Sequence, residues 1–255
     1  MDEHKDILAS LEQIDALDYI LMRIVTWNCN GAFRKKYQAL EEYAADILIV
    51  QECEDPALST KAYREWAGKC LWKGDNKNKG IGVFPRPGVN VSELAWSDGG
   101  LQLFLPCRVN ESFNLLAVWT KYADSLNFRY IGQLWKYLQL NSKLLMSDRL
   151  VLCGDFNSNT CWDEWDRWWN HSDVVTQLEE INVSSIYHRY FKEEQSAESR
   201  PTLFHHRKIE KPYHVDYAFC TESMFVEKKD SLDVGEPSNW LEFSDHMPLA
   251  FTVTE

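Results

Sequence analysis

Short apolar or alternating runs recur along the chain from Arg23 onward, and such runs are typical of β-strands. The runs are RIVTW, DILIV, GIGVF, VSELAW, LQLFL, SFNLLAVW, RLVLC, VDYAF and PLAFTV. Between them, apolar residues at helical spacing predict helices at about residues 37–45, 57–68, 127–145 and 162–181. Because strands outnumber helices and several are joined by short links, we expect two mixed, mainly antiparallel sheets packed as a sandwich and flanked by helices.

The first residues differ from the rest of the chain. Apolar side chains repeat at helical spacing within residues 1–21, with charged residues between them, which predicts an amphipathic helix. Met22 begins a natural first strand, so an appendage or an over-extended start explains residues 1–21 equally well. No repeat or linker divides the remainder of the chain, and we therefore expect an extension at 1–21 and a single domain at 22–255.

Composition limits the class of protein. Apolar residues make up 45% of the chain, enough for a large core, and no apolar run approaches the roughly 20 residues needed to span a bilayer. The N-terminus lacks the order of a secretory signal. The seven cysteines are scattered and never spaced as Cys-x-x-Cys, which indicates reduced, mostly buried thiols rather than disulfides or zinc ligands. A cytoplasmic protein is expected.

The charge is acidic but unevenly distributed. With 27 Lys and Arg against 39 Asp and Glu, the net charge of −12 opposes tight binding to a phosphate backbone. Three stretches are nevertheless locally basic: residues 34–36, residues 69–79 and residues 200–211. A basic rim on an acidic body would suit a polyanionic substrate.

Polar residues with acid-base or metal-binding capacity lie at the ends of the predicted strands. Three strands end in Asn28 and Asn30, in Gln51 and Glu52, and in Asp155 and Asn157, whereas Asp216, Asp245 and His246 stand at the start of later strands. If those later strands run antiparallel to the first three, their starts and the other strands' ends lie at one pole, where a single cluster can form from Asn28, Glu52, Asp155, Asn157, Asp216, Asp245 and His246. Four carboxylates in one pocket repel one another unless protons or a cation neutralise them, and oxygen ligands favour a hard cation such as Mg²⁺.

Five motifs then carry a family resemblance. TWNCNG, QE, GDFNS, HVDY and SDHMPL, in this order over residues 26–249, resemble the ordered motifs of the endonuclease/exonuclease/phosphatase superfamily. A single such motif is weak evidence, but five in register over nearly the whole chain are strong. The resemblance implies an α/β (α+β) four-layer sandwich, a metal-dependent phosphodiesterase activity and a site at one end of the paired sheets.

The resemblance also implies a metal site. Glu52 would be the principal Mg²⁺ ligand, assisted by Asn28 and Asp245, and Mn²⁺ could substitute for Mg²⁺. The family often has Asp where this chain has Asn30, so Asn30 is assigned to substrate binding rather than to a second metal.

Catalytic roles follow from the same motifs. Asp155 would orient or deprotonate the attacking water, and Asn157 would hold that water or the phosphate. His246, oriented by Asp216, would donate a hydrogen bond to a non-bridging phosphate oxygen. The sequence leaves open whether Asp155 or His246 is the general base.

Substrate choice depends on residues outside the motifs. Lys121 and Tyr122 stand where the family usually has His or Tyr, and we expect one of them to contact the phosphate. The basic stretches favour a nuclease that cuts DNA or RNA; the alternative is a small-molecule or lipid phosphodiesterase or phosphatase.

Most tryptophans and histidines outside the motifs are expected to have structural rather than catalytic roles. Trp162, Trp165 and Trp169 lie at helical spacing, which predicts burial, whereas Trp168 faces elsewhere and is free to meet a substrate. His171 and His214 are expected to be surface or hydrogen-bonded polar residues rather than ligands.

Overall fold

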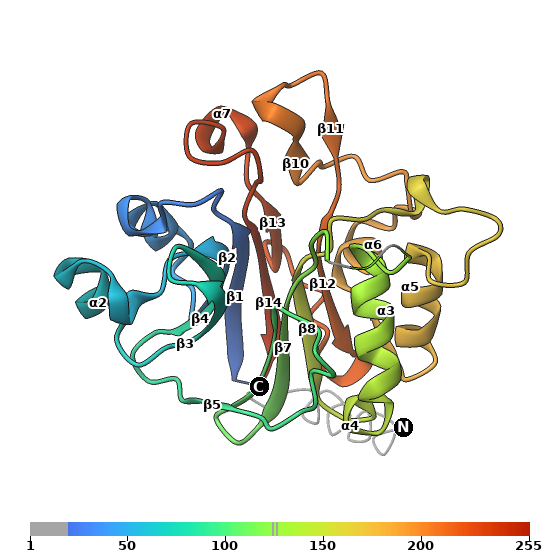
Figure 1. Ribbon diagram of the computed structural model, residues 1–255, viewed down its shortest axis with the longest axis horizontal. Coiled ribbons are helices and arrows are strands. Elements are labelled where there is room, and N and C mark those ends of the chain that lie inside the picture. Colours follow the sequence, from blue (N-terminus) through green and yellow to red (C-terminus); the bar gives the residue numbers. More distant parts are fainter. Residues whose placement is uncertain (1–19, 124, 126) are drawn as a thin grey trace, which may run out of the picture.

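Two six-stranded β-sheets form the centre of the structure, a computed structural model that describes residues 20–123, 125 and 127–255. Helices flank both sheets (Figure 1). The helix predicted within residues 1–21 lies almost entirely outside the described residues. The predicted sandwich of two mixed sheets with flanking helices is confirmed.

The first sheet has the strand order β13-β14-β1-β2-β4-β3. Its strands are β1 (Leu21–Asn28), β2 (Ile47–Cys53), β3 (Leu71–Asn76), β4 (Lys79–Pro85), β13 (Leu232–Val234) and β14 (Leu249–Thr254). β1 runs parallel to β2 and antiparallel to β14. The ends of β1 and β2 therefore lie at the same edge as the start of β14.

The second sheet has the order β5-β6-β7-β8-β12-β9. Its strands are β5 (Val91–Glu93), β6 (Phe104–Val109), β7 (Phe113–Trp119), β8 (Leu150–Asp155), β12 (Asp216–Thr221) and β9 (Val183–Ser185). β8 is parallel to β7 and antiparallel to β12. A separate hairpin of β10 (Leu203–Phe204) and β11 (Pro212–Tyr213) projects beyond the sheets at the top of Figure 1.

Alternate residues of the strands face two cores. Leu115 and Val151 belong to the core between the sheets, whereas Leu116 and Leu152 belong to a second core beneath the helices. This alternation is the period of two that a β-strand imposes on its side chains. Both faces of the second sheet are therefore covered, which explains why these strands read as continuous apolar runs.

The helices and short 3-10 turns complete the outer layers. They are η1 (Phe33–Lys35), η2 (Tyr37–Tyr43), η3 (Pro56–Leu58), α2 (Lys61–Ala67), α3 (Ile131–Leu140), α4 (Ser142–Leu145), η4 (Thr160–Trp162), α5 (His171–Glu179), α6 (Ile186–Phe191), η5 (His205–Arg207), η6 (Glu222–Met224) and α7 (Pro237–Trp240). None of the helices in the described part of the chain has the length and hydrophobicity of a membrane-spanning segment.

The helix predicted at 162–181 is wrong in its first half. The α-helix begins only at His171, because Asn170 caps it and Asp163 accepts hydrogen bonds from the backbone of its first turn. The Asn170 amide also donates to the carbonyls of Glu164 and Arg167, which replaces the helical hydrogen bonds of residues 163–169. The burial predicted for Trp162 and Trp165 is wrong for the same reason, since both are exposed.

Candidate active site

Strand ends from both sheets meet at one pole. Asp155, the last residue of β8, pairs in register with Asp216, the first residue of β12. Asn28, the last residue of β1 in the other sheet, donates from Nδ2 to Asp155 Oδ2 at 2.9 Å. The predicted cluster depended on later strands running antiparallel to earlier ones, and this arrangement is present in both sheets. The hydrogen bond between Asn28 and Asp155 links the two sheets.

Asp155 is the centre of a buried hydrogen-bond network. Besides Asn28, its carboxylate accepts from the backbone N–H of Asn157 at 2.8 Å and from Asn157 Nδ2 at 2.7 Å. Burial raises the pKa of Asp155 to about 7; the His246 charge opposes this shift, and the negative charge of Asp216 adds to it. Three amide donors thus orient a carboxyl group whose proton affinity is suited to neutral pH.

His246 and Asp216 form a second buried pair. His246 Nδ1 lies 2.8 Å from Asp216 Oδ2, and the backbone carbonyl of His246 accepts from Trp27 Nε1 at 2.9 Å. Burial disfavours the charged ring, but the carboxylates of Asp216 and Asp155 outweigh it and raise the pKa of His246 to about 10. The imidazole is therefore protonated at neutral pH.

Asn30 connects Asp245 to this network. Its backbone N–H donates to Asn28 Oδ1 at 3.0 Å, and its Nδ2 donates to Asp245 Oδ1 at 2.8 Å. Asn30 has a φ of 52°, in the left-handed region that Asn adopts more readily than most residues. The structure thus brings together Asn28, Asn30 and Asp245.

Glu52 lies at the same end of the first sheet, but its side chain contacts a lysine. β1 and β2 pair Asn28 with Gln51, and the register of β2 against β4 shifts between Gln51 and Cys53. Glu52 is the residue at this bulge and has a φ of 63°, which is costly for a residue of its type. Its Oε2 accepts from Lys79 Nζ at 2.6 Å. The positive charge of the Lys79 side chain thus already neutralises the Glu52 carboxylate.

Lys121 and Tyr122 stand beside the network without joining it. The preceding residue, Thr120, donates its backbone N–H to the carbonyl of Asp155 at 2.9 Å. Lys121 Nζ, however, contacts Asp75 Oδ2 at 2.5 Å, and the Tyr122 ring packs under Arg129 at 4.2 Å. Both side chains line an open hollow of about 490 Å³.

Three buried hydroxyl groups support the site and were not predicted. Ser244 Oγ accepts from the His246 N–H at 3.0 Å and donates to the Asn28 carbonyl at 2.7 Å, while Thr202 Oγ1 accepts from the Asp216 N–H at 3.0 Å. Thr120 Oγ1 donates to the Phe156 carbonyl. Only the position of Ser244 inside SDHMPL hinted at such a role, because Ser and Thr residues are common throughout the chain.

The residues at this pole fit a divalent cation. A carboxylate oxygen of Asp155, a carboxylate oxygen of Asp216 and a ring nitrogen of His246 lie within 4.8 Å of one another, and the two carboxylates are the groups that could bind a cation, because the protonated His246 ring cannot. Two of the three are buried carboxylates, and Asp216 Oδ1 has no hydrogen-bond partner among the described residues. With Glu52 and Asp245 at the same pole, negative charge exceeds the positive charge of His246 and Lys79, and a hard cation would relieve the excess.

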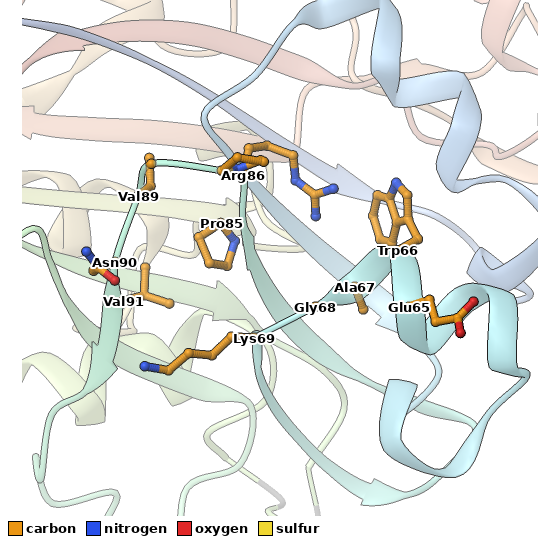
Figure 2. A pocket seen from close by; sticks show the side chains of 12 residues that line it. Glu65, Trp66, Ala67, Gly68, Lys69, Pro85, Arg86, Val89, Asn90 and Val91 are labelled. Carbon is orange, nitrogen blue, oxygen red and sulfur yellow. The ribbon is translucent and has the colours of Figure 1, made fainter.

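A separate hollow lies at the other end of the first sheet. It has a volume of about 380 Å³ and is lined by the end of α2 and by the segment that follows β4, including Trp66 and Arg86 (Figure 2). Pro85, in its wall, pairs with Ile47 at the start of β2, whereas Glu52 stands near the end of that strand. The hollow is therefore remote from the polar network.

Comparisons with known proteins agree with this geometry. The profile of the Endonuclease/Exonuclease/phosphatase family matches residues 25–246. The search of curated protein sequences returned no significant match. Among solved structures, an AP endonuclease from Archaeoglobus fulgidus has a TM-score of 0.66 and 18% identity, with 92% of this chain and 99% of that chain covered. A 3'-5' exonuclease (NExo) from Neisseria meningitidis has a TM-score of 0.61 and 19% identity, covering 90% and 98%. The chain therefore belongs to the endonuclease/exonuclease/phosphatase family of phosphoric ester hydrolases.

Proposed function

We propose that the protein is a Mg²⁺-dependent phosphodiesterase of the cytoplasm that hydrolyses DNA or RNA. The observation that carries the proposal is the pairing of two buried groups, an Asp155 carboxylate held by amide donors and the His246–Asp216 pair beside it. A structure of NExo from Neisseria, described as a 3' phosphatase bound to product DNA hairpin, supports nucleic acid as the substrate class.

Asp155 is the better candidate for the general base. Burial holds its pKa near 7, so its carboxylate can accept a proton from water at neutral pH, and Asn157 helps to hold that water or the phosphate. His246, with its pKa raised to about 10, carries a proton and acts as a donor. Asp216 holds Nδ1, so Nε2 is the nitrogen that donates to a non-bridging phosphate oxygen and stabilises the transition state.

Glu52, Asn28 and Asp245 would hold the Mg²⁺, and Mn²⁺ would replace it. When bound, the cation would neutralise negative charge on the phosphate oxygens. Asn30 would assist binding of the substrate, because its side chain already orients Asp245. Lys121 and Tyr122 would bind the phosphate backbone at the edge of the site, beside the hollow that they line.

The test is a hydrolysis panel with single- and double-stranded DNA and RNA. Wild-type protein should cleave at least one of these substrates with Mg²⁺ or Mn²⁺, and EDTA should abolish cleavage. Asp155→Asn and His246→Gln should each lower the turnover number by several orders of magnitude. Asp148→Asn is the matched control, because Asp148 is exposed and precedes β8 at the end opposite to Asp155.

Two outcomes would reject the proposal. The first is that wild-type protein cleaves no nucleic acid with either metal, and the second is that Asp155→Asn retains full turnover. Hydrolysis of small phosphate esters in the absence of nucleic-acid cleavage would transfer the assignment to small-molecule substrates.

A further inference from the structure

An exposed group of tryptophans follows the catalytic strand. Residues 160–169, here called the aromatic loop, begin three residues after Asn157. Within this loop the exposed fraction is 97% for Trp165, 64% for Trp168 and 43% for Trp162. Such large apolar surface is costly to leave in water, and three neighbouring exposed tryptophans indicate a binding surface rather than scattered exposure.

A basic hairpin lies against this loop. Residues 203–213, here called the basic hairpin, contain β10 and β11, and the Tyr213 ring at the hairpin's end lies 5.1 Å from the Trp162 ring. Between the strands, Arg207, Lys208 and Lys211 are exposed, and Glu210 is the one acidic residue. The two elements thus lie in contact through Trp162 and Tyr213.

The basic hairpin is connected directly to the catalytic residues. Leu203 forms an antiparallel bridge with His246, and the Phe204 N–H donates to the Asp245 carbonyl at 2.8 Å. The base of the hairpin therefore lies beside the proposed phosphoester site, on the segment that carries His246.

Several basic side chains of the other basic stretches have partners within the protein. Arg34 pairs with the buried Glu54, and Lys36 Nζ donates to the carbonyls of Cys29 and Phe243 at 2.7 and 2.6 Å. Lys79 pairs with Glu52 at 2.6 Å. In contrast, neither Lys208 nor Lys211 has a side-chain ion pair among the described residues. On a protein of net charge −12, this hairpin is a local positive surface that complements a polyanion.

We propose that the aromatic loop and the basic hairpin bind a single-stranded, unpaired segment of nucleic acid and lead it to the phosphoester site. This inference rests on the proposed function and names the strand type that the site accepts. Unpaired bases present both faces for stacking on tryptophan, whereas the bases of a duplex are already stacked on their neighbours. The lysines contact the phosphates, which supplies the electrostatic part of the affinity.

Binding is measured by fluorescence anisotropy with a labelled oligothymidylate and with a blunt duplex, in EDTA so that no strand is cut. Trp165→Ala should weaken binding of the single strand about tenfold, within the range for one lost stacking contact, and leave duplex binding nearly unchanged. Trp165→Phe should retain most of the affinity. Met146→Ala is the matched control, because Met146 is 71% exposed and precedes β8 at the end opposite to Asp155.

Salt dependence separates stacking from charge. Each phosphate contact contributes about 0.7 to the slope of log affinity against log salt for a single strand. Lys208→Ala should therefore reduce the slope by about that amount, whereas Trp165→Ala should lower the affinity at every salt concentration without changing the slope. An unchanged affinity in Trp165→Ala, or an equal loss for single strand and duplex, overturns the inference and assigns the tryptophans to another kind of partner.

A second readout keeps the two proposals apart. Hydrolysis of bis(4-nitrophenyl) phosphate with Mg²⁺ reports on the phosphoester site without strand binding, and Trp165→Ala should leave its rate unchanged. If wild-type protein cleaves nucleic acid but Trp165→Ala binds single strands normally, only the inference fails. If the wild type binds single strands through Trp165 but cleaves neither nucleic acid nor this ester, the proposed function fails instead.

Discussion

His171 makes the stability of the protein depend on pH in a way that can be calculated. Its ring is fully buried, neither ring nitrogen has a hydrogen-bond partner among the described residues, and the ring packs against Tyr217 at 4.8 Å and Phe156 at 6.4 Å. The prediction that it would be a surface or hydrogen-bonded residue is therefore wrong. Burial lowers the pKa of His171 from 6.5 to about 4.

The sign depends on which state binds the proton first. As the pH falls below 6.5, the unfolded chain protonates His171 while the folded protein does not, so the free energy of unfolding decreases until the pH reaches about 4. A difference of about 2.5 pKa units corresponds to about 3 kcal/mol, since each unit is worth about 1.4 kcal/mol. The contribution of the neutral His171 ring to the free energy of unfolding is therefore complete above pH 6.5, the pKa in the unfolded chain, and is lost as the pH falls from 6.5 to about 4.

His171→Phe removes the titration while keeping an aromatic ring in the cavity. The free energy of unfolding is measured by urea denaturation in EDTA at a series of pH values from about 7 to about 4. The quantity to compare is the difference in unfolding free energy between the variant and the wild type. The raised pKa of Asp155 makes the unfolding free energy of both proteins increase as the pH falls, which opposes the effect of His171. That difference should shift by about 3 kcal/mol in favour of the variant as the pH falls.

The control is His205→Phe, which removes an exposed imidazole. Its stability should follow the wild type at every pH. A constant offset between His171→Phe and the wild type over the whole range would refute the reasoning, because it would mean that the buried ring protonates as easily in the folded protein as in the unfolded chain.

Three further predictions concern the site and its surroundings. Gly154→Ala should destabilise the protein by at least about 3 kcal/mol in urea denaturation, because Gly154 has a φ of 145° and an added Cβ would lie 1.8 Å from the Val118 carbonyl oxygen; Gly31→Ala, with positive φ but open space, should cost much less. Lys79→Gln should lower the half-saturating Mg²⁺ concentration of hydrolysis about two- to fivefold by freeing Glu52, whereas exposed Lys77→Gln should not; an unchanged Mg²⁺ titration would contradict the role given to Glu52. Burial opposes the charge of Glu198, but hydrogen bonds, of which the one from His188 is the largest, lower the pKa of Glu198 to about 2. The free energy of unfolding of the wild type should therefore decrease as the pH falls from about 4.5 toward 2, and that of Glu198→Gln should decrease less. Parallel curves of unfolding free energy against pH for the two proteins would refute this.

The fold and the polar network were predictable because they depend on local pattern. Runs such as DILIV and RLVLC identify buried strands, and polar residues directly after them mark strand ends. Once β12 and β14 are known to be antiparallel to β8 and β1, the meeting of Asn28, Asp155, Asp216 and His246 follows from topology. Short strands such as β3, β9 and β13 were missed because each is too brief or too polar to produce a signal.

Other features depend on contacts between distant segments. The bulge at Glu52 arises from the pairing of β2 with β4, and no residue in the segment QEC indicates a bulge from the sequence alone. The helical spacing of Trp162, Trp165 and Trp169 was misleading, because the side chains of Asp163 and Asn170 satisfy the backbone groups that would otherwise have extended α5. Capping contacts override periodicity here, and Trp162 and Trp165 are left exposed as a consequence, whereas Trp169 is partly buried against Phe128.

The connection between the basic hairpin and the site has a further consequence for catalysis. Because Leu203 pairs with His246 and the Phe204 N–H donates to the Asp245 carbonyl, the backbone that carries the imidazole is also the backbone that supports the hairpin. A strand bound on the hairpin would stabilise these hydrogen bonds and therefore the position of His246 against Asp216. Lys208→Ala should then lower the turnover number for a long single strand as well as its affinity, while leaving the turnover of bis(4-nitrophenyl) phosphate unaffected. Equal turnover of long strands by wild type and variant at saturation would mean that the hairpin only captures the strand and does not influence His246.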